Sequence, residues 1–371
     1  MNTTEASEHE RAAQVALAQV NGIGYGRRTT LFQACSTAYG ALAAPFEFLR
    51  SLPGISTACA TAIKATSVAE GERVLGEVER HGGRCLLPGD PDYPAILASI
   101  PEPPGVLFAL GRLDVLERPA VAVVGSRDHS AYGADACRLV VQAAANAGLA
   151  VISGMARGLD AVAHLAALDL GARTIGVLGN GFGVIYPAAN RVLYERMRRE
   201  GLLLTEFAPG ERPTAGSFQR RNRLISGLAR VTVVVEAASG SGTLITVEAA
   251  LAQGRDVMVV PGPITSPTSV GTNRLLRDGA TPFLESTDLL ASFPERRASA
   301  RVGAAAAPAA PALSLTSLEH RVLQTLDRLP RHLDALIEVT GLPAAELLAT
   351  LSALELCGVV RQEPGRRFLR A

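Results

Sequence analysis

Glycine and hydroxyl residues follow several apolar segments of this chain, in a pattern that suits phosphate binding. They occur in four short turns, which are Gly125-Ser126-Arg127, Ser153-Gly154, Asn180-Gly181 and Ser241-Gly242-Thr243. Glycine lets backbone amides approach a phosphate closely, and a turn that opens a helix directs the N-terminus of that helix toward the anion. One such turn would be weak evidence, but four predict a ligand that carries phosphate.

A cationic segment with one aromatic residue lies between the third and fourth turns, and we expect it to be a loop that leads into a short helix. Its residues are Phe218, Arg220, Arg221, Asn222 and Arg223, and Arg157 adds a cation after the second turn. Proteins that bind single-stranded nucleic acid place arginines along the phosphates and stack a base on an aromatic ring. The alternative is that Phe218 anchors the core and the arginines are solvated. The neighbouring turns favour binding.

The motifs of common nucleotide enzymes are incomplete. The first turn lacks the G-x-G-x-x-G of dinucleotide dehydrogenases, and the chain contains no G-x-x-x-x-G-K-[ST] of a Walker ATPase. Residues 239–243 resemble the phosphate loop of nucleotide N-glycoside hydrolases of the lysine-decarboxylase-like group. That group has a glutamate where this chain has Ile245 and Thr246, and Glu248 comes later. Such a hydrolase is the alternative function. The main hypothesis needs no catalytic residue, metal or cofactor.

Three carboxylates deserve a structural explanation beside a catalytic one. Asp160 precedes His164 by one helical turn, and we expect it to stabilise the first turn of its helix and to hold His164. Glu206 and Glu236 each end an apolar strand, where we expect them to bind backbone amides or nearby arginines rather than to act as catalytic acids.

The elements that position these residues are predicted to form a Rossmann-like core. From Ala120 onward, helical segments alternate with six apolar segments, at 121–126, 149–154, 174–179, 202–207, 231–237 and 256–262. Continuous apolar strands of this kind predict a parallel sheet that is covered by helices on both faces. Ligands of such sheets bind beyond the carboxyl ends of the strands, where the four turns stand.

Three further segments flank this α/β core. Residues 1–86 are predicted to be a helical, helix-hairpin-helix or SAM-like domain with glycine turns at 20–24 and 52–56. The core domain is predicted over 87–293 and begins with an extended, proline-dense lead-in at 87–119. An Ala/Pro-rich linker is expected at 294–314, and three helices with a hairpin predict a winged helix over 315–371.

The third helix of that predicted winged helix has no lysine or arginine, so sequence-specific reading of a major groove is not expected. Basic side chains occur instead in the hairpin, at Arg361, Arg366, Arg367 and Arg370. The tail therefore predicts either phosphate contact through the hairpin or a role in protein interaction.

The composition is that of a folded protein without a global charge signal. Hydrophobic residues make up 48% of the 371 residues and the formal net charge is +1, so a nucleic-acid surface has to be local.

Five cysteines form no C-x-x-C pair, which argues against structural zinc. The first residues are polar and acidic, and the apolar runs are short. A cytoplasmic protein without a membrane partner is expected.

Taken together, the motifs resemble the DNA-processing protein A (DprA/Smf) family over nearly the whole chain. The resemblance is carried by YPAILASIPEPPGVLFALG, VAVVGSR, SGMARGLDAVAHLAAL, LGNGFGVIYPAAN, FQRRNRLISGLA and SGTLITVEAALAQGRDVMVVPG. It implies a non-enzymatic recombination mediator that binds incoming single-stranded DNA in natural transformation, displaces single-strand-binding protein and loads RecA. Repair is an open further role, and a homodimer through the Rossmann-like domain is implied.

The resemblance also implies which residues hold the strand. They are Ser126 and Arg127 of the first turn and Phe218, Arg221, Asn222 and Arg223 of the cationic segment, completed by the other three turns. Two positions depart from the family pattern. Gln219 stands where a proline is usual, and Gly240 stands where a basic residue is usual, which implies weaker phosphate contact at that turn.

Overall fold

The computed structural model describes residues 3–294, 296, 315–327 and 330–370. It separates two compact units, Met1–Val302 and Gly303–Ala371, which are described one at a time. The predicted linker at 294–314 lies almost entirely outside the described residues.

A nine-stranded sheet is the centre of the first unit. Its strand order is β1-β2-β6-β5-β4-β3-β7-β8-β9. The strands are β1 (Arg84–Leu86), β2 (Leu107–Gly111), β3 (Ala120–Val124), β4 (Ala150–Ser153), β5 (Thr174–Val177), β6 (Leu202–Thr205), β7 (Val231–Val234), β8 (Asp256–Val259) and β9 (Thr281–Pro282). The six predicted strands are β3 to β8, and all of them pair in parallel. The order reverses at β3, because β4 pairs with one side of it and β7 with the other.

The predicted lead-in at 87–119 is more than a connection, because it contains β2. This strand pairs antiparallel with both β6 and β1, so it extends the parallel core by two strands. The apolar segment Leu107 to Leu110 is buried. The sheet can therefore use it as an interior strand, although the preceding prolines suggested an extended approach only. The same region holds α7 (Ala95–Ala98) and the 3-10 helix η1 (Leu113–Glu117).

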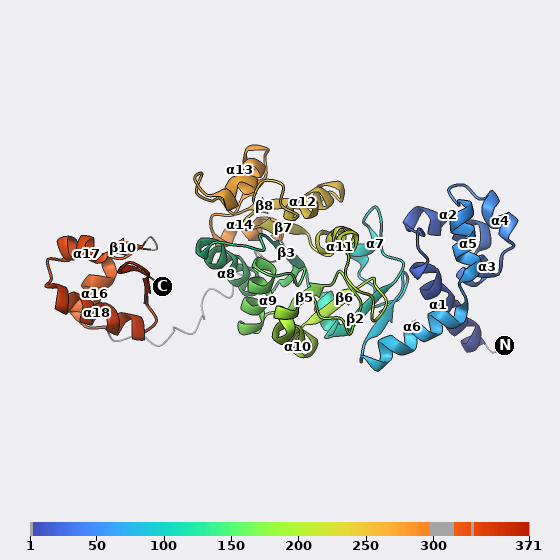
Figure 1. The fold of residues 1–371 in the computed structure, drawn as a ribbon, viewed down its shortest axis with the longest axis horizontal. Helices are drawn as coiled ribbons and strands as arrows, with labels where there is room; N and C mark the ends of the chain where they lie inside the picture. Colours follow the sequence, from blue (N-terminus) through green and yellow to red (C-terminus); the bar gives the residue numbers. More distant parts are fainter. Residues whose placement is uncertain (1–2, 295, 297–314, 328–329, 371) are drawn as a thin grey trace. The chain divides into compact units, whose positions relative to one another are not determined.

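Helices cover both faces of the sheet (Figure 1). One apolar layer joins α8 (Ala131–Asn146), α9 (Leu159–Asp169) and α14 (Ser286–Ala291) to alternate residues of β3, β4, β7 and β8. The opposite layer includes α7, α11 (Ala215–Gly227) and α12 (Thr243–Ala252). Val121 and Val123 belong to the first layer, and Ala122 and Val124 to the second, as the alternation of side chains along a strand requires. The remaining helices are α10 (Arg191–Glu200), α13 (Val270–Arg277), η2 (Ala188–Asn190) and η3 (Pro267–Ser269).

Six helices precede the sheet and share an apolar cluster of their own. They are α1 (Thr3–Gln19), α2 (Tyr25–Cys35), α3 (Ala38–Ala43), α4 (Phe46–Ser51), α5 (Thr57–Ala65) and α6 (Val68–Arg80). The two predicted glycine turns connect α1 to α2 and α4 to α5. Gly22 and Gly54 adopt φ of 85° and 78° there, a left-handed conformation in which a side chain would be strained.

The second unit has the elements of a winged helix. Its helices are α16 (Ser317–Gln324), α17 (Leu333–Thr340) and α18 (Ala344–Leu356), and its strands are β10 (Arg331–His332), β11 (Val360–Glu363) and β12 (Arg367–Arg370). The strands pair in the order β10-β12-β11. Within the described residues, no single helix is both long and apolar enough to span a membrane; α17 and α18 pass that test only as a pair, which is bent by 107°.

Candidate functional site

The main cleft lies at the carboxyl end of the sheet, where the strand order reverses. It has a volume of about 740 Å³ and is enclosed by the turn after β3, the loop after β7 and helix α11. This is the place where open α/β sheets bind their ligands. The predicted site residues that line it are Gly125, Ser126, Arg127, Phe218, Arg221, Asn222, Ser241, Gly242 and Thr243. The fold therefore brings together two of the four predicted turns and part of the cationic segment.

The cationic segment is helical, which corrects the expectation of a loop. Residues Phe218 to Arg223 belong to α11, which begins after Thr214. The Thr214 hydroxyl accepts a hydrogen bond from the Ser217 amide at 3.1 Å, and the Ser217 hydroxyl accepts one from the Thr214 amide at 2.9 Å. This reciprocal cap starts the helix one turn earlier than the apolar pattern suggested. As a result, consecutive residues of the segment point in different directions.

Phe218 and Arg127 meet at the mouth of the main cleft. The guanidinium carbon of Arg127 lies 5.7 Å from the centroid of the Phe218 ring, and the Arg127 side chain is exposed. The Phe218 ring packs on Gly179 so closely that a Cβ there would lie 2.7 Å from a ring carbon. A half-buried ring beside an exposed guanidinium is the arrangement that single-strand binders use for a base and its phosphate.

A smaller side pocket of about 260 Å³ adjoins the main cleft. The Ser153-Gly154 and Asn180-Gly181 turns contribute Gly154 and Asn180 to its wall, and Arg157 contributes its exposed side chain. Arg157 donates a hydrogen bond of 2.6 Å to Asp128, so its charge is already paired at the surface. Arg127 and Phe218 line both the side pocket and the main cleft.

Sequence reasoning missed Tyr186, which also lines both hollows. Its ring centroid lies 5.4 Å from that of Phe218, with the ring planes inclined at 37°. The side chain is 46% exposed. The LGNGFGVIYPAAN motif contained this tyrosine, but nothing in the spacing connected it with Phe218, because Tyr186 lies in the loop after β5 and Phe218 in α11, and the two meet only in the folded protein.

Arg221 lies beneath the cleft floor rather than on the surface. It is 4% exposed, and its Nη1 donates to the carbonyl oxygens of Gly154 and Val177, the latter at 2.7 Å. Burial lowers the pKa of its guanidinium to about 10, so the group remains charged at neutral pH. Asp160 is the compensating charge, and its carboxylate also accepts from the amides of Gly154 and Ala156 at 3.1 and 3.3 Å. Arg221 therefore fixes the loops after β4 and β5.

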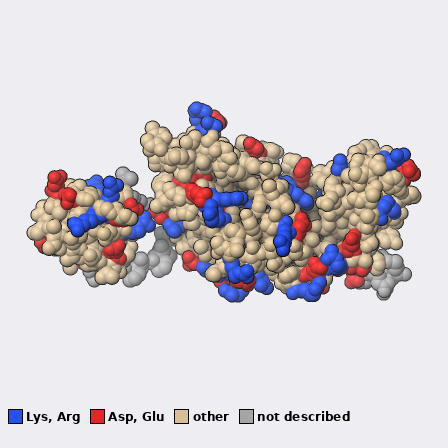
Figure 2. Space-filling model, in the orientation of Figure 1, with Lys and Arg blue, Asp and Glu red and all other residues tan. Residues whose placement is uncertain are grey.

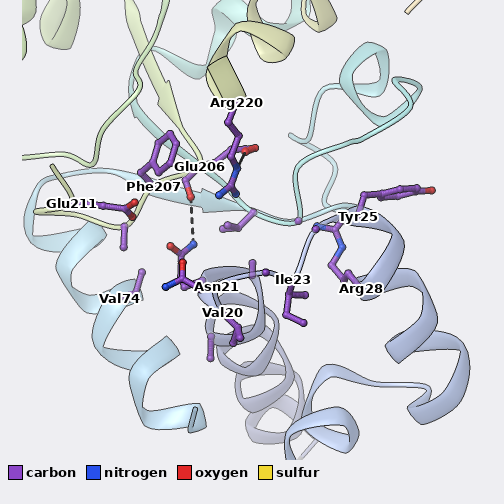
Figure 3. Close-up of a pocket in the computed structure, with 18 of the residues that line it drawn as sticks. Val20, Asn21, Ile23, Tyr25, Arg28, Val74, Glu206, Phe207, Glu211 and Arg220 are labelled. Carbon is purple, nitrogen blue, oxygen red and sulfur yellow. Dashed lines mark hydrogen bonds and ion pairs between the residues drawn. The ribbon is translucent and has the colours of Figure 1, made fainter. Parts of the chain in front are cut away.

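Arg220 and Arg223 point away from the main cleft, to the other side of α11. Both bind Glu206, which is 2% exposed, through Arg220 Nε at 3.0 Å and Arg223 Nη2 at 2.6 Å to the same oxygen. The rear pocket of about 620 Å³ lies there, between these side chains and the turn from α1 to α2 that includes Asn21 (Figure 3). The expectation that Glu206 binds arginines is met, and these two arginines are held as its partners.

Three further site candidates fill structural positions. The Ser153 hydroxyl donates to the carbonyl of Val123 at 2.7 Å, and the Asn180 amide nitrogen donates to Gly181 and Val184 at 3.0 and 2.7 Å. Gly181 packs against the backbone of Ala208, where a Cβ would overlap the carbonyl. These residues shape the wall of the hollows, and among them only Asn180 lines one.

The loop after β7 forms the opposite rim of the main cleft. The Ser241 hydroxyl accepts from the Thr243 amide at 3.3 Å, and helix α12 starts after Gly242 without a side-chain cap. Gly240 adopts a φ of 70° with open space around it, so the departure from a basic residue leaves the rim without a cation at that position. The neighbouring Gln219 is exposed in the first turns of α11.

The Asp160–His164 pair expected from the sequence is wrong in one respect. His164 Nδ1 lies 2.7 Å from the Thr174 hydroxyl, whereas Asp160 faces the amides described above. Burial lowers the pKa of His164 to about 3, so the ring is neutral. Glu236 accepts from the Ser130 amide at 3.0 Å and from the Thr268 hydroxyl at 3.0 Å, as expected for a strand-ending carboxylate that binds amide and hydroxyl groups.

The second unit presents its basic residues as the sequence suggested. Arg361, Arg366, Arg367 and Arg370 are all exposed on the β11–β12 hairpin. Across the face visible in Figure 2, basic and acidic side chains are interspersed, so a phosphate-binding surface depends on local groups rather than on a broad field.

A Rossmann-like sheet with a cleft lined by Arg127 and Phe218 at its switch point, in one chain with a winged helix, defines a multidomain α/β protein. The model of DNA recombination-mediator protein A matches residues 84–294, and that of the DprA winged helix domain matches 305–366. The chain belongs to this DNA recombination-mediator protein A (DprA/Smf) family. Its role is that of a DNA-processing recombination mediator.

Individual relatives agree with this assignment. The chain is 36% identical over 327 residues to protein Smf of Synechocystis sp., which covers 80% of this chain and 82% of the relative. Protein Smf of Escherichia coli is 38% identical over 290 residues, or 76% of each chain. The crystal structure of DNA processing protein A from Streptococcus pneumoniae superposes with a TM-score of 0.65 at 31% identity and covers 78% of this chain and 98% of that one.

A fourth similar protein is DNA processing protein A from Helicobacter pylori, whose structure is described in terms of its single-stranded DNA binding mode. It superposes with a TM-score of 0.52 at 26% identity and covers 57% of this chain and 96% of that one.

Proposed function

We propose that this protein binds single-stranded DNA in the main cleft and loads RecA onto it. The observation that carries the proposal is the contact of Arg127 with Phe218 at the mouth of a switch-point cleft. The ring offers a stacking face to a base of any identity, and the exposed guanidinium offers charge to the adjoining phosphate. Binding of this kind has little sequence preference, which suits a protein that handles incoming DNA.

Within this proposal, the site candidates divide into two groups. Ser126, Arg127, Phe218, Asn222 and the Ser241-Gly242-Thr243 turn contact the strand, because they line the cleft and leave polar groups or a ring facing it. Arg221, Ser153 and Gly181 hold the walls in position from below. Arg220 and Arg223 support α11 through Glu206.

Family membership together with this cleft supports the proposal of a finer role. A mediator in natural transformation or repair has to take strands that single-strand-binding protein already covers and transfer them to RecA. A cleft that holds the strand through stacking and exposed polar groups can compete locally with single-strand-binding protein and release the strand when RecA polymerises. Salt should weaken binding, because phosphates release counterions where Arg127 replaces them.

A homodimer through the Rossmann-like domain is part of the proposal. Ile264 and Leu284 are 92% and 72% exposed, and they follow the adjacent parallel strands β8 and β9 at the same rim of the sheet. Two large apolar side chains that are this strongly exposed favour contact with a second copy of the chain. Light scattering of the Ile264→Glu variant tests it. A monomer is expected, and a dimer of unchanged affinity would contradict this surface.

The central experiment is RecA-mediated strand exchange on DNA that single-strand-binding protein already coats. Stimulation by the wild-type chain, and its loss in Phe218→Ala, is expected. Incubation with nucleoside monophosphates provides the opposing test, since release of free base would favour the N-glycoside hydrolase instead. Strand exchange that is the same with and without the chain would contradict RecA loading.

A further inference from the structure

We infer that Tyr186 is a second base-stacking residue and that the side pocket receives one nucleobase, next to the base that stacks on Phe218. This inference rests on the proposed binding of single-stranded DNA and adds to it a residue and a subsite. The inference starts from the half-exposed Tyr186 ring, which lines both hollows. Its centroid lies 5.4 Å from the centroid of the Phe218 ring.

The position of the ring is fixed by its loop. The loop from β5 to α10 is tied at its start by Asn180, whose amide nitrogen donates to the carbonyls of Gly181 and Val184. At its end, Asn190 donates to the carbonyls of Met155 and Ala156 at 3.0 and 3.1 Å. Phe182 between them is fully buried. A ring held from both sides loses little freedom when a base stacks on it, which favours binding.

Exposed tyrosines occur elsewhere on this chain, so the neighbours of Tyr186 rather than its exposure mark it for a role. Tyr186 is 46% exposed at the junction of the two hollows, beside a second ring and a guanidinium. The two rings are inclined at 37°, so they do not stack flat on each other. Together with Arg127 they form the partition between the main cleft and the side pocket.

The side pocket has the chemistry of a base site rather than of a phosphate site. Its volume is about 260 Å³, below the roughly 300 to 1,000 Å³ of pockets for whole drug-sized ligands. Glycine and small residues of the loop after β4 line one side, and Pro187 lies beside Tyr186. Arg157 is the cation of the side pocket that lies outside the partition. It already donates a hydrogen bond of 2.6 Å to Asp128. A flat, neutral base therefore suits the side pocket better than a phosphate does.

The sugar-phosphate chain then continues into the main cleft. Arg127 lies at the boundary and can bind the phosphate between two successive bases, one in each hollow. The Ser241-Gly242-Thr243 turn across the cleft offers hydroxyl and amide groups to the next phosphate. The geometry thus gives a two-nucleotide unit, with the bases separated by the Tyr186–Phe218 partition.

The test compares two probes of equal length, a fluorescein-labelled oligothymidylate and an abasic chain that keeps sugars and phosphates. Tyr186→Ala should weaken oligothymidylate binding about tenfold, the loss of one stacked base, and Tyr186→Phe should restore wild-type affinity. On the abasic chain, Tyr186→Ala and the wild type should bind equally. Tyr39→Ala removes another exposed tyrosine, on α3, and should change neither affinity.

Each outcome separates the subsite from the wider proposal. If the wild type does not bind oligothymidylate, the proposed function fails. If the wild type binds and Tyr186→Ala binds equally well, or loses as much affinity on the abasic chain as on oligothymidylate, the subsite is refuted while DNA binding stands. Thermal unfolding of each variant accompanies the titrations, and Tyr186→Leu, which keeps an apolar side chain but removes the aromatic ring, replaces the alanine variant should that variant be unstable.

Discussion

Arg221 and Gly154 are matched to each other beneath the main cleft. Arg221 Nη1 donates to the carbonyl oxygen of Gly154, and a Cβ at position 154 would overlap the same guanidinium. The glycine of the second turn is therefore required by a buried cation rather than by close approach of a ligand. This relationship separates the residues that shape the cleft from those that face it.

Gly154→Ala should destabilise the fold by about 1 to 3 kcal/mol, because an extra methyl group in a filled interior forces Arg221 to move. Urea unfolding measures the change. Gly76→Ala is the matched control, since Gly76 lies in α6 with open space at its Cβ. The control should be stabilised by up to about 1 kcal/mol, the helix preference of alanine over glycine. Equal stability of the two variants would refute the packing argument.

Arg221→Met should cost about 2 to 5 kcal/mol, because it leaves two buried carbonyls and Asp160 without their partner. Arg127→Met should change stability by less than about 0.5 kcal/mol, as expected for an exposed side chain. The unfolding free energies of both variants are compared with the wild type. A stable Arg221→Met variant that no longer binds DNA would instead indicate direct contact with the strand.

Arg127→Ala should lower the salt dependence of single-stranded DNA binding. Each phosphate contact contributes about 0.7 to the slope of log affinity against log salt concentration for single strands. Loss of one contact should reduce the slope by about that amount, measured by fluorescence anisotropy across a salt series. Arg138→Ala removes an exposed cation on α8 and should leave the slope as it is. An unchanged slope in Arg127→Ala would exclude this arginine from phosphate contact.

Glu206→Gln should destabilise the protein by about 3 kcal/mol, because the partly buried Arg223 loses its counterion. The control is Glu195→Gln, which breaks an exposed pair with Arg198 and should cost less than about 0.5 kcal/mol. DNA affinity should fall less in Glu206→Gln than in Arg127→Ala. A larger loss of affinity, at unchanged stability, would place Arg220 and Arg223 among the strand-binding groups.

His164→Gln should flatten the fall of stability on the acid side. The unfolded chain binds a proton at His164 below about pH 6.5, whereas burial holds the folded pKa near 3, so protonation favours unfolding between these values. The wild type should lose about 2 kcal/mol through this residue between pH 8 and pH 5, by the linkage relation. Urea unfolding of the wild type and the variant at pH 8 and pH 5 measures this loss of stability. A wild-type loss no greater than that of the variant would contradict this assignment.

The sheet could be predicted from the sequence because its core strands are continuous apolar runs. Strands β4 to β8 each fall within a predicted segment and β3 begins one residue before its segment, and the turns that follow the strands were expected at the ligand edge. The antiparallel β2 was missed because prolines precede it and its apolar residues belong to a chain segment without alternating helices. Pairing with β6 is a long-range choice that local pattern does not reveal.

The sequence predicted which residues lie near the site better than it predicted what each of them does there. Phe218 and Arg127 could be selected by type, but their contact depends on how α11 crosses the strand ends. Helical spacing within α11 sends Arg221 inward and Arg220 and Arg223 to the rear, which a loop interpretation conceals. Tyr186 escaped notice because no spacing in the sequence connects it with Phe218, and its contact with that ring is what sets it apart from the other exposed tyrosines.

Strand β9 is the edge strand of the sheet, next to β8, and it limits how a second copy of this chain can bind at this edge. The strand has only two residues, and one of them, Pro282, has no amide hydrogen to donate. A continuous sheet running through a pair of molecules is therefore ruled out along β9, since too few backbone groups are free to bond. Contact there has to rely on side chains, so its strength should respond to single substitutions.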